Sequence, residues 1–150
     1  MQAPAPPRPP TNLPEPVSEL IGRDVEVEEI VGLASAHRLV TLTGAGGIGK
    51  TRLGLEVARR LLPRFVDGVW VIELAPLSDP DLVAATVATA LGLDLADNVV
   101  SHERVANALA TKQLLLVLDN CEHLVGAAAS MAEALLRANP EARVMATSGR

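Results

Sequence analysis

The stretch RLVTLTGAGGIGKTRL at residues 38–53 decides the fold that we expect for this chain. Its first part, residues 38–44, is an apolar run typical of a buried β-strand. The segment GAGGIGKT at residues 44–51 then matches the pattern G-x-x-x-x-G-K-T, and an amphipathic helical pattern follows it. A strand, a glycine-rich loop and a helix in this order form a phosphate-binding loop, the P-loop. The sequence therefore predicts a nucleotide site built around this loop.

The predicted loop has a separate task for each kind of residue. Its glycines allow backbone conformations that residues with a Cβ avoid, so successive N–H groups can point at phosphate oxygens. Lys50 would contact the β- and γ-phosphates, and the Thr51 hydroxyl would bind magnesium at the helix N-terminus. We expect ATP or ADP with Mg²⁺ as the ligand. The expected nucleotide-binding residues of this region are Gly44, Ala45, Gly46, Gly47, Ile48, Gly49, Lys50, Thr51 and Arg52.

A second candidate site follows the apolar run at residues 114–118. This run predicts a buried strand that ends in Asp119, where P-loop proteins carry a carboxylate for magnesium. The next residue is Asn120, which cannot accept a proton from an attacking water, so efficient hydrolysis is not expected. Glu122 has two interpretations: a water-polarising acid, or an acid in the first turn of a helix that needs no catalytic role. The expected catalytic residues are Lys50, Asp119 and Glu122.

The rest of the chain alternates short apolar runs with longer amphipathic ones, which is typical of βαβ units with a parallel sheet. The expected strands are residues 38–44, 68–75, 113–120 and 142–148. Their almost continuous apolar character indicates strands covered by helices on both faces. Further helices are expected over residues 80–91, 101–111 and 124–138. The expected fold class is α/β, a P-loop NTPase with three layers, α/β/α, and a mostly parallel sheet.

Composition limits the function classes. The 150 residues allow one domain, and seven of the eleven prolines fall in the first 16 residues. We therefore expect a proline-rich linker or tail over residues 1–16 and the nucleotide-binding domain over residues 17–150. A net charge of −5 and the scarcity of aromatic residues argue against a nucleic-acid surface in this segment. The single cysteine, the apolar-poor start and the lack of a long apolar run indicate a cytoplasmic protein that does not enter a membrane.

Four segments together resemble a known family: LIGRDVEVEEI (20–30), GAGGIGKT (44–51), LLLVLDNCEH (114–123) and ARVMATS (142–148). They are similar to the nucleotide-binding domain of STAND-type ATPases, the AAA-like signal-transduction NTPases that include NB-ARC proteins. Within that class, these segments are most similar to those of bacterial transcriptional regulators of the LuxR and SARP types. The resemblance covers about residues 12–150.

The resemblance implies further nucleotide contacts outside the P-loop. Gly22 and Arg23, with Glu26, would belong to a motif that the family places near the adenine and ribose. The family also carries an arginine after the fourth strand as a sensor of the γ-phosphate, usually directly after serine. In this chain Gly149 follows the serine, so the implied sensor is Arg150, displaced by one position.

The resemblance also implies a longer protein. Relatives in this family continue into a fifth strand, a helical lid, a winged helix and often sensor domains, with a DNA-binding domain at one terminus. This chain would then hold four strands, with the strand at 38–44 at an open edge of the sheet, beside the strand at 142–148. The implied partners are nucleotide, those further domains of the same protein, DNA only through a separate domain, and other copies in a nucleotide-dependent oligomer.

Three functions remain open at this point. The first is an ATP/ADP-binding switch in a transcriptional regulator, with slow hydrolysis at most. The second is a competent ATPase or kinase, against which Asn120 and the lack of an acceptor site argue. The third is a fragment that folds without tight nucleotide binding, because the lid over the adenine would be missing.

Overall fold

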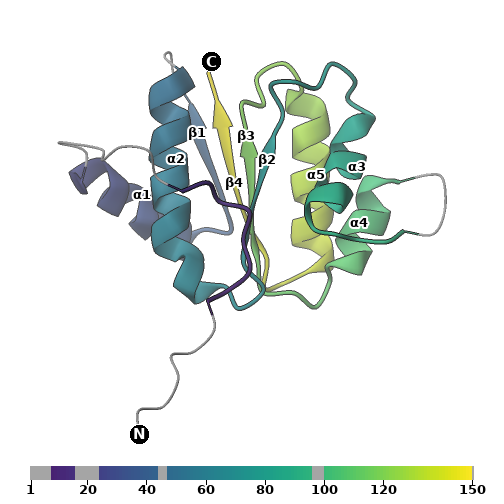
Figure 1. Ribbon diagram of the computed structural model, residues 1–150, viewed down its shortest axis with the longest axis horizontal. Coiled ribbons are helices and arrows are strands. Elements are labelled where there is room, and N and C mark those ends of the chain that lie inside the picture. Colours follow the sequence, from purple (N-terminus) through teal and green to yellow (C-terminus); the bar gives the residue numbers. More distant parts are fainter. Residues whose placement is uncertain (1–7, 16–23, 44–46, 96–99, 150) are drawn as a thin grey trace, which may run out of the picture.

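A parallel sheet of four strands forms the centre of the molecule (Figure 1). The computed structural model describes residues 8–15, 24–43, 47–95 and 100–149. Its strands are β1 (Leu39–Thr43), β2 (Val69–Glu73), β3 (Leu115–Asp119) and β4 (Arg143–Ser148). The apolar runs predicted all four to within two residues at each end. The predicted α/β class with a parallel sheet is therefore confirmed.

Helices cover both faces of the sheet and complete three layers. They are α1 (Asp24–Ala36), α2 (Gly47–Leu61), α3 (Leu82–Ala90), α4 (His102–Ala108) and α5 (Val125–Ala138), with a short 3-10 helix, η1 (Leu62–Arg64). Figure 1 shows α1 and α2 on one side of the sheet and α3, α4 and α5 on the other. The Ser101 hydroxyl caps α4, since it accepts the N–H of Arg104 at 3.1 Å.

The strand order is β1-β4-β3-β2, and every pair is parallel. The chain crosses from β1 to the far edge of the sheet through α2, then returns through β3 to β4. This path inserts β4 between the strand before the P-loop and the strand that ends in Asp119. The carboxyl ends of β1, β4 and β3 consequently lie together at one end of the sheet, where α2 also begins (Figure 1). In the described residues, β1 is an edge strand beside β4, as expected.

Each face of the sheet has its own apolar core. On the first face, α2 contributes Leu53, Val57 and Leu61, the residues that its periodicity placed on one side. On the other face, α5 contributes Ala128, Met131 and Leu135 against α3, α4 and the sheet. Burial of these side chains is the main force that holds the layers together.

The strands differ in how completely they are covered. All residues of β3 are buried, and so are all but the first of β4. In β1, Leu39, Thr41 and Thr43 are exposed while Val40 and Leu42 pack on the α2 side. The expectation of cover on both faces is therefore wrong for β1. Its outer face instead lines an apolar groove of about 670 Å³ that α5 borders.

Part of the predicted proline-rich tail packs on the sheet. Residues 8–15 run beside β2 and then across α2 (Figure 1). Thr11 forms a parallel bridge with Val69, and its hydroxyl donates to the Val69 carbonyl oxygen at 2.6 Å. The Asn12 amide donates to the Val71 carbonyl oxygen at 2.8 Å and accepts the Val71 N–H at 2.7 Å. These eight residues are thus not a free spacer.

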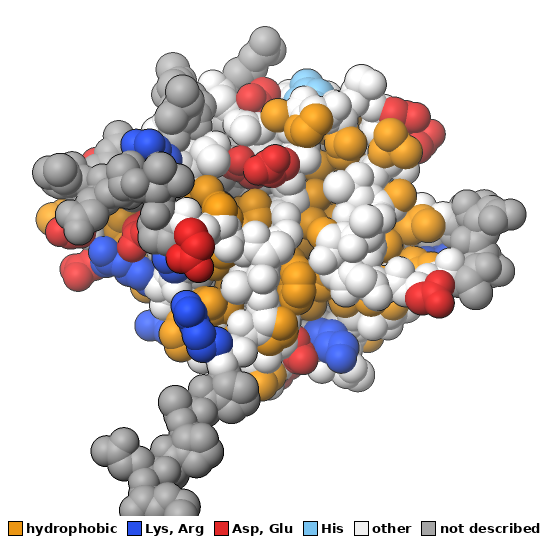
Figure 2. Space-filling model, in the orientation of Figure 1, with side chains coloured by type: hydrophobic (Ala, Val, Ile, Leu, Met, Phe, Trp, Pro, Cys, Tyr) orange, Lys and Arg blue, Asp and Glu red, His pale blue; other side chains and the backbone are white. Residues whose placement is uncertain are grey.

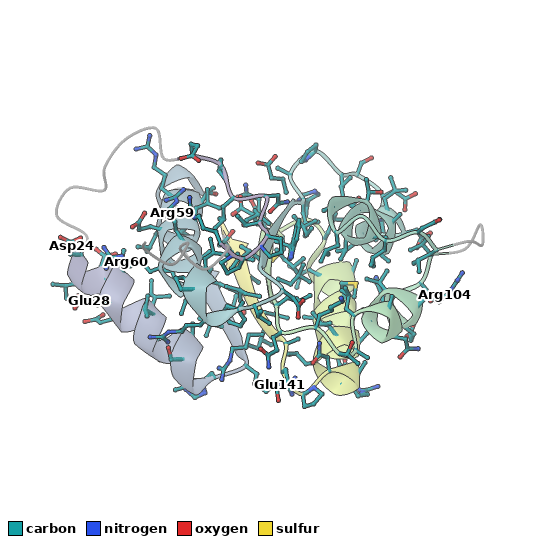
Figure 3. All side chains as sticks on the ribbon, turned by 60° about the horizontal axis from the view of Figure 1, so that its bottom comes forward. Asp24, Glu28, Arg59, Arg60, Arg104 and Glu141 are labelled. Atoms are coloured by element: carbon teal, nitrogen blue, oxygen red, sulfur yellow. The ribbon has the colours of Figure 1, made fainter. Side chains whose placement is uncertain are left out.

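The charged side chains on the surface are of both signs (Figure 2), and the net charge of the chain is −5. Lys and Arg side chains are interspersed with Asp and Glu on the face shown in Figure 2, rather than gathered in one basic patch. Figure 3 shows one contact between opposite charges, where Arg60 of α2 meets Asp24 of the neighbouring helix α1 at 3.3 Å. Among the described helices, none is both long and apolar enough to cross a membrane.

Candidate functional site

Asp119 and Thr51 meet at the carboxyl edge of the sheet. Asp119 is the last residue of β3 and is only 3% exposed. Thr51 lies in the first turns of α2, and its hydroxyl donates to the Asp119 carboxylate, with Oγ1 3.1 Å from Oδ1 and 3.2 Å from Oδ2. The fold thus joins two residues that are 68 positions apart in the sequence. These are the two residues that the sequence assigned to magnesium.

Thr147, near the end of β4, contacts the same carboxylate, and the sequence analysis missed it. It is 2% exposed, and its hydroxyl donates to the Asp119 carboxylate while accepting the N–H of Asn120 at 2.9 Å. A Cβ at Gly54 of α2 would lie 3.1 Å from the Thr147 methyl carbon, so this glycine lets α2 approach β4 closely. The available signal was a hydroxyl residue at the end of a predicted strand. Its importance depends on the strand order, which places β4 in the middle.

Asn120 adopts a left-handed backbone conformation, with φ at +57°. This conformation favours glycine and asparagine, and it turns the chain sharply as β3 ends. The Asn120 side-chain nitrogen donates to Asp119 Oδ2 at 3.3 Å. The amide therefore supports the carboxylate and supplies no proton acceptor next to it.

Glu122 lies on the same turn but points to the end of β4. Its Oε2 accepts the N–H of Gly149 at 3.2 Å. It does not lie in the first turn of a helix, because α5 begins at Val125. The helical interpretation of this acid is therefore wrong.

Some of the remaining predicted nucleotide-binding residues belong to the described part of the chain, and the others do not. Gly47 and Gly49 begin α2 together with Ile48, Lys50 and Arg52, and the Lys50 side chain is half-buried while Arg52 is exposed. Glu26 lies on the exposed side of α1. The other expected contacts fall outside the described residues: Gly22, Arg23, Gly44, Ala45, Gly46 and Arg150.

The residues in place fit a magnesium ion and a phosphate group. Magnesium prefers oxygen donors, and this edge of the sheet presents a threonine hydroxyl and a buried carboxylate in contact with each other. The N-terminus of α2 and Lys50 supply positive charge beside them. The donor set is thus of the kind that binds a magnesium–phosphate complex.

Two other polar residues near Asp119 have structural roles. Burial raises the pKa of the Cys121 thiol, and the Glu122 and Asp119 carboxylates raise it further, so the thiol stays protonated at neutral pH. The His123 ring lies apart from it, with Nε2 2.6 Å from the carbonyl oxygen of Leu77. Cys121 is therefore a packed core residue and not a nucleophile paired with His123.

Sequence comparison finds a protein family over most of the chain. A family model described as an AAA domain matches residues 33–147. An uncharacterized protein of Mycobacterium tuberculosis is 36% identical over 132 residues, which cover 88% of this chain and 34% of that protein. A putative HTH-type transcriptional regulator of M. tuberculosis is 41% identical over 116 residues, covering 77% of this chain and 13% of its own length. The regulatory protein AfsR of Streptomyces coelicolor is 32% identical over 131 residues, covering 74% and 13%. The chain thus spans about a third of the first relative and less of the others.

Solved structures with low sequence identity share the fold. The Aeropyrum pernix ORC2 protein, solved as ADPNP-ADP complexes, superposes with a TM-score of 0.66 at 15% identity, covering 87% of this chain and 42% of that one. Drosophila ORC bound to DNA superposes with a TM-score of 0.57 at 17% identity, covering 87% and 39%. At these identities the likeness concerns the fold, which is that of the P-loop ATPases.

Proposed function

The chain belongs to the AAA domain family, and on this premise we propose that it binds ATP or ADP with Mg²⁺ as the switch domain of a transcriptional regulator. The observation that carries the proposal is the contact of 3.1 Å between Asp119 and Thr51, the last residue of the P-loop sequence. The nucleotide would supply the phosphates. The P-loop backbone from Gly44 to Gly49 and Lys50 would hold these phosphates, and Thr51 with Asp119 would hold the metal.

We propose slow hydrolysis at most. The position after the metal carboxylate carries Asn120, whose amide is bonded to that carboxylate and cannot take a proton. Such a site would keep ATP intact for a long time, which suits a nucleotide-dependent switch better than an enzyme with rapid turnover. Gly22, Arg23 and Arg150 would complete the site on the adenine and γ-phosphate sides, in line with the STAND and NB-ARC resemblance.

We infer the regulatory role from the names of similar proteins. Relatives named as transcriptional regulators match over only 13% of their own length, so the rest of such a protein is available for sensing and for binding DNA. In a protein of this kind the nucleotide state would change how this domain packs against the further domains or against other copies. Sedimentation velocity with and without nucleotide measures the second possibility.

Thermal unfolding tests the binding proposal. The chain is heated with MgATP, with MgADP and without nucleotide, at ligand concentrations up to the millimolar range. A ligand at about a hundred times its dissociation constant stabilises a protein by about 2.7 kcal/mol. We expect such a shift in the parent chain, its loss in Lys50→Ala and a weaker shift when EDTA removes the metal.

Two variants sharpen the result. Lys112→Ala removes an exposed lysine at the opposite end of the sheet and should keep the full nucleotide shift. Asp119→Asn keeps the size of the buried side chain and should lose the magnesium dependence. No shift in the parent chain would instead support a fragment that folds without tight nucleotide binding, and rapid phosphate release would support a competent ATPase.

A further inference from the structure

The turn after β3 is bonded to the end of β4 beyond the paired part of the two strands. The last register pair of these strands joins Leu118 and Ala146. Past this pair, Cys121 donates its N–H to the carbonyl oxygen of Thr147 at 2.9 Å. The Asn120 N–H reaches the hydroxyl of the same threonine. Glu122 adds a third bond, from the turn to the residue after β4, because its side chain accepts the N–H of Gly149.

Glu122 and Gly149 fit each other closely. Glu122 Oε2 accepts the Gly149 N–H at 3.2 Å, and a Cβ built at Gly149 would lie 3.2 Å from Oε1 and 3.6 Å from the carboxyl carbon. Both carboxylate oxygens therefore lie against residue 149. A Cβ at that position would be tighter than an ordinary contact, so the carboxylate would have to shift by a few tenths of an ångström. A hydrogen bond from an N–H to an ionised carboxylate is stronger than one between neutral groups.

This contact lies next to the metal residues. Residue 149 follows β4, and β4 carries Thr147, whose hydroxyl bonds the Asp119 carboxylate. The backbone that Glu122 holds is thus the continuation of β4, the strand that lies between β1 and β3. If this backbone shifts, the Thr147 hydroxyl shifts with it, because the two are joined through one residue.

We propose that Glu122 is a positioning residue, which clasps the backbone after β4 through Gly149 and so keeps Thr147 on the Asp119 carboxylate. It does not serve as the base for an attacking water. The inference rests on the proposed nucleotide site, and it assigns to this acid a contact with protein rather than with the reacting atoms.

Three variants test the clasp. Glu122→Gln keeps an oxygen acceptor of the same size but removes the basic group, whereas Glu122→Ala removes both. Gly149→Ala leaves the carboxylate intact but crowds it. The readouts are amide hydrogen exchange at Gly149 without nucleotide, and phosphate release with MgATP. Glu141→Ala, which removes an exposed acid before β4 at the other end of the sheet, is the control (Figure 3).

A clasp predicts that Glu122→Gln, whose amide oxygen still accepts the N–H in a weaker bond, speeds exchange at residue 149 less than Glu122→Ala does and keeps most of the phosphate release. Glu122→Ala should speed exchange of the amide at residue 149 about tenfold, which corresponds to the loss of one hydrogen bond, and Gly149→Ala should speed it by up to that factor. Gly149→Ala should have little further effect in the Glu122→Ala background, because the crowded carboxylate is then absent. Control exchange should match the parent.

Other outcomes overturn the inference. A base would make Glu122→Gln lose about 10²–10⁴-fold in phosphate release, as much as Glu122→Ala. Equal Gly149 exchange in the parent and in Glu122→Ala would show that no clasp exists. The exchange measurement needs no nucleotide, so it decides the clasp even if the parent shows no nucleotide-dependent stabilisation and the proposed function fails.

Discussion

The two edges of the sheet are finished in different ways. Residues 8–15 cover the β2 edge, whereas no described segment pairs with the outer edge of β1. On the covered side, Gly68 leads into β2 with φ at +98°, close against Pro10. On the other side, Leu39 is 47% exposed. Within the described part of the chain, the sheet therefore has one edge that residues 8–15 close and one edge that is open.

The covered edge shows how a proline-rich segment can cap a strand. Proline has no N–H to donate, so Pro9, Pro10 and Pro14 cannot form a normal ladder. Asn12 replaces the missing peptide group, because its amide both donates to and accepts from Val71. Arg59 of α2 then donates to the Pro14 carbonyl oxygen at 2.9 Å, so the cap is also joined to the helix that begins at the P-loop.

Gly68→Ala should give the largest effect on this comparison. Its Cβ would lie 1.8 Å from the Pro10 carbonyl oxygen, in a backbone conformation that alanine avoids. We expect a loss of about 2–4 kcal/mol in the free energy of unfolding, from backbone strain and from lost hydrogen bonds. Urea unfolding measures it. Gly92→Ala, with φ at +67° and no atom within 4 Å, carries the strain alone and should cost about 1–2 kcal/mol. Equal losses for both variants would show that the cap adds nothing at Gly68.

Asn12→Ala should come next, with a loss of about 1–2 kcal/mol for two hydrogen bonds at a partly exposed site. Amide exchange at Val71 should become faster, since its N–H donates to the Asn12 side chain. Glu15→Ala, an exposed neighbour in the same segment, should leave Val71 exchange unchanged. If the two variants behave alike, the amide of Asn12 is not what closes this edge.

Arg59→Ala should have a smaller effect, about 0.5–1 kcal/mol, because Arg59 contributes one hydrogen bond to the cap. The effect should shrink in a chain that lacks residues 1–15, where Arg59 keeps only its ion pair with Glu56. Arg60→Ala is the matched control, since Arg60 bonds Glu56 and Asp24 but no residue of the cap. A loss for Arg59→Ala that is the same with and without residues 1–15 would contradict the coupling.

Leu39→Lys should have the smallest effect on stability, within about 0.5 kcal/mol, because the side chain is half-exposed. Its effect should be on association instead, since a charge on an open edge strand opposes pairing with another chain. Sedimentation velocity over a range of concentrations should show less self-association than in the parent. Leu82→Lys, at an equally exposed leucine of α3, should leave association unchanged. A similar decrease for both variants would argue that the β1 edge is not the route.

Some residues of the candidate site could be predicted from the sequence, and others could not. The residues of the P-loop sequence and Asp119 stand out locally, because each depends on a short pattern and on the strand or helix beside it. Thr147 has no such pattern, and its link to Asp119 spans 28 positions. Glu122 was noted from its place near Asp119, but its partner, Gly149, could be identified only from the fold.

By itself the sequence determined the α/β class, the four strands to within two residues, four of the five described α-helices that cover them, and the phosphate-loop sequence. These follow from apolar periodicity and from glycine, proline and capping residues, which act over a few neighbouring positions. Only the tertiary structure decided that residues 8–15 close the β2 edge and that Thr51 and Thr147 both bond the Asp119 carboxylate. Both depend on which strands become neighbours, and this is set by packing between segments far apart in the chain.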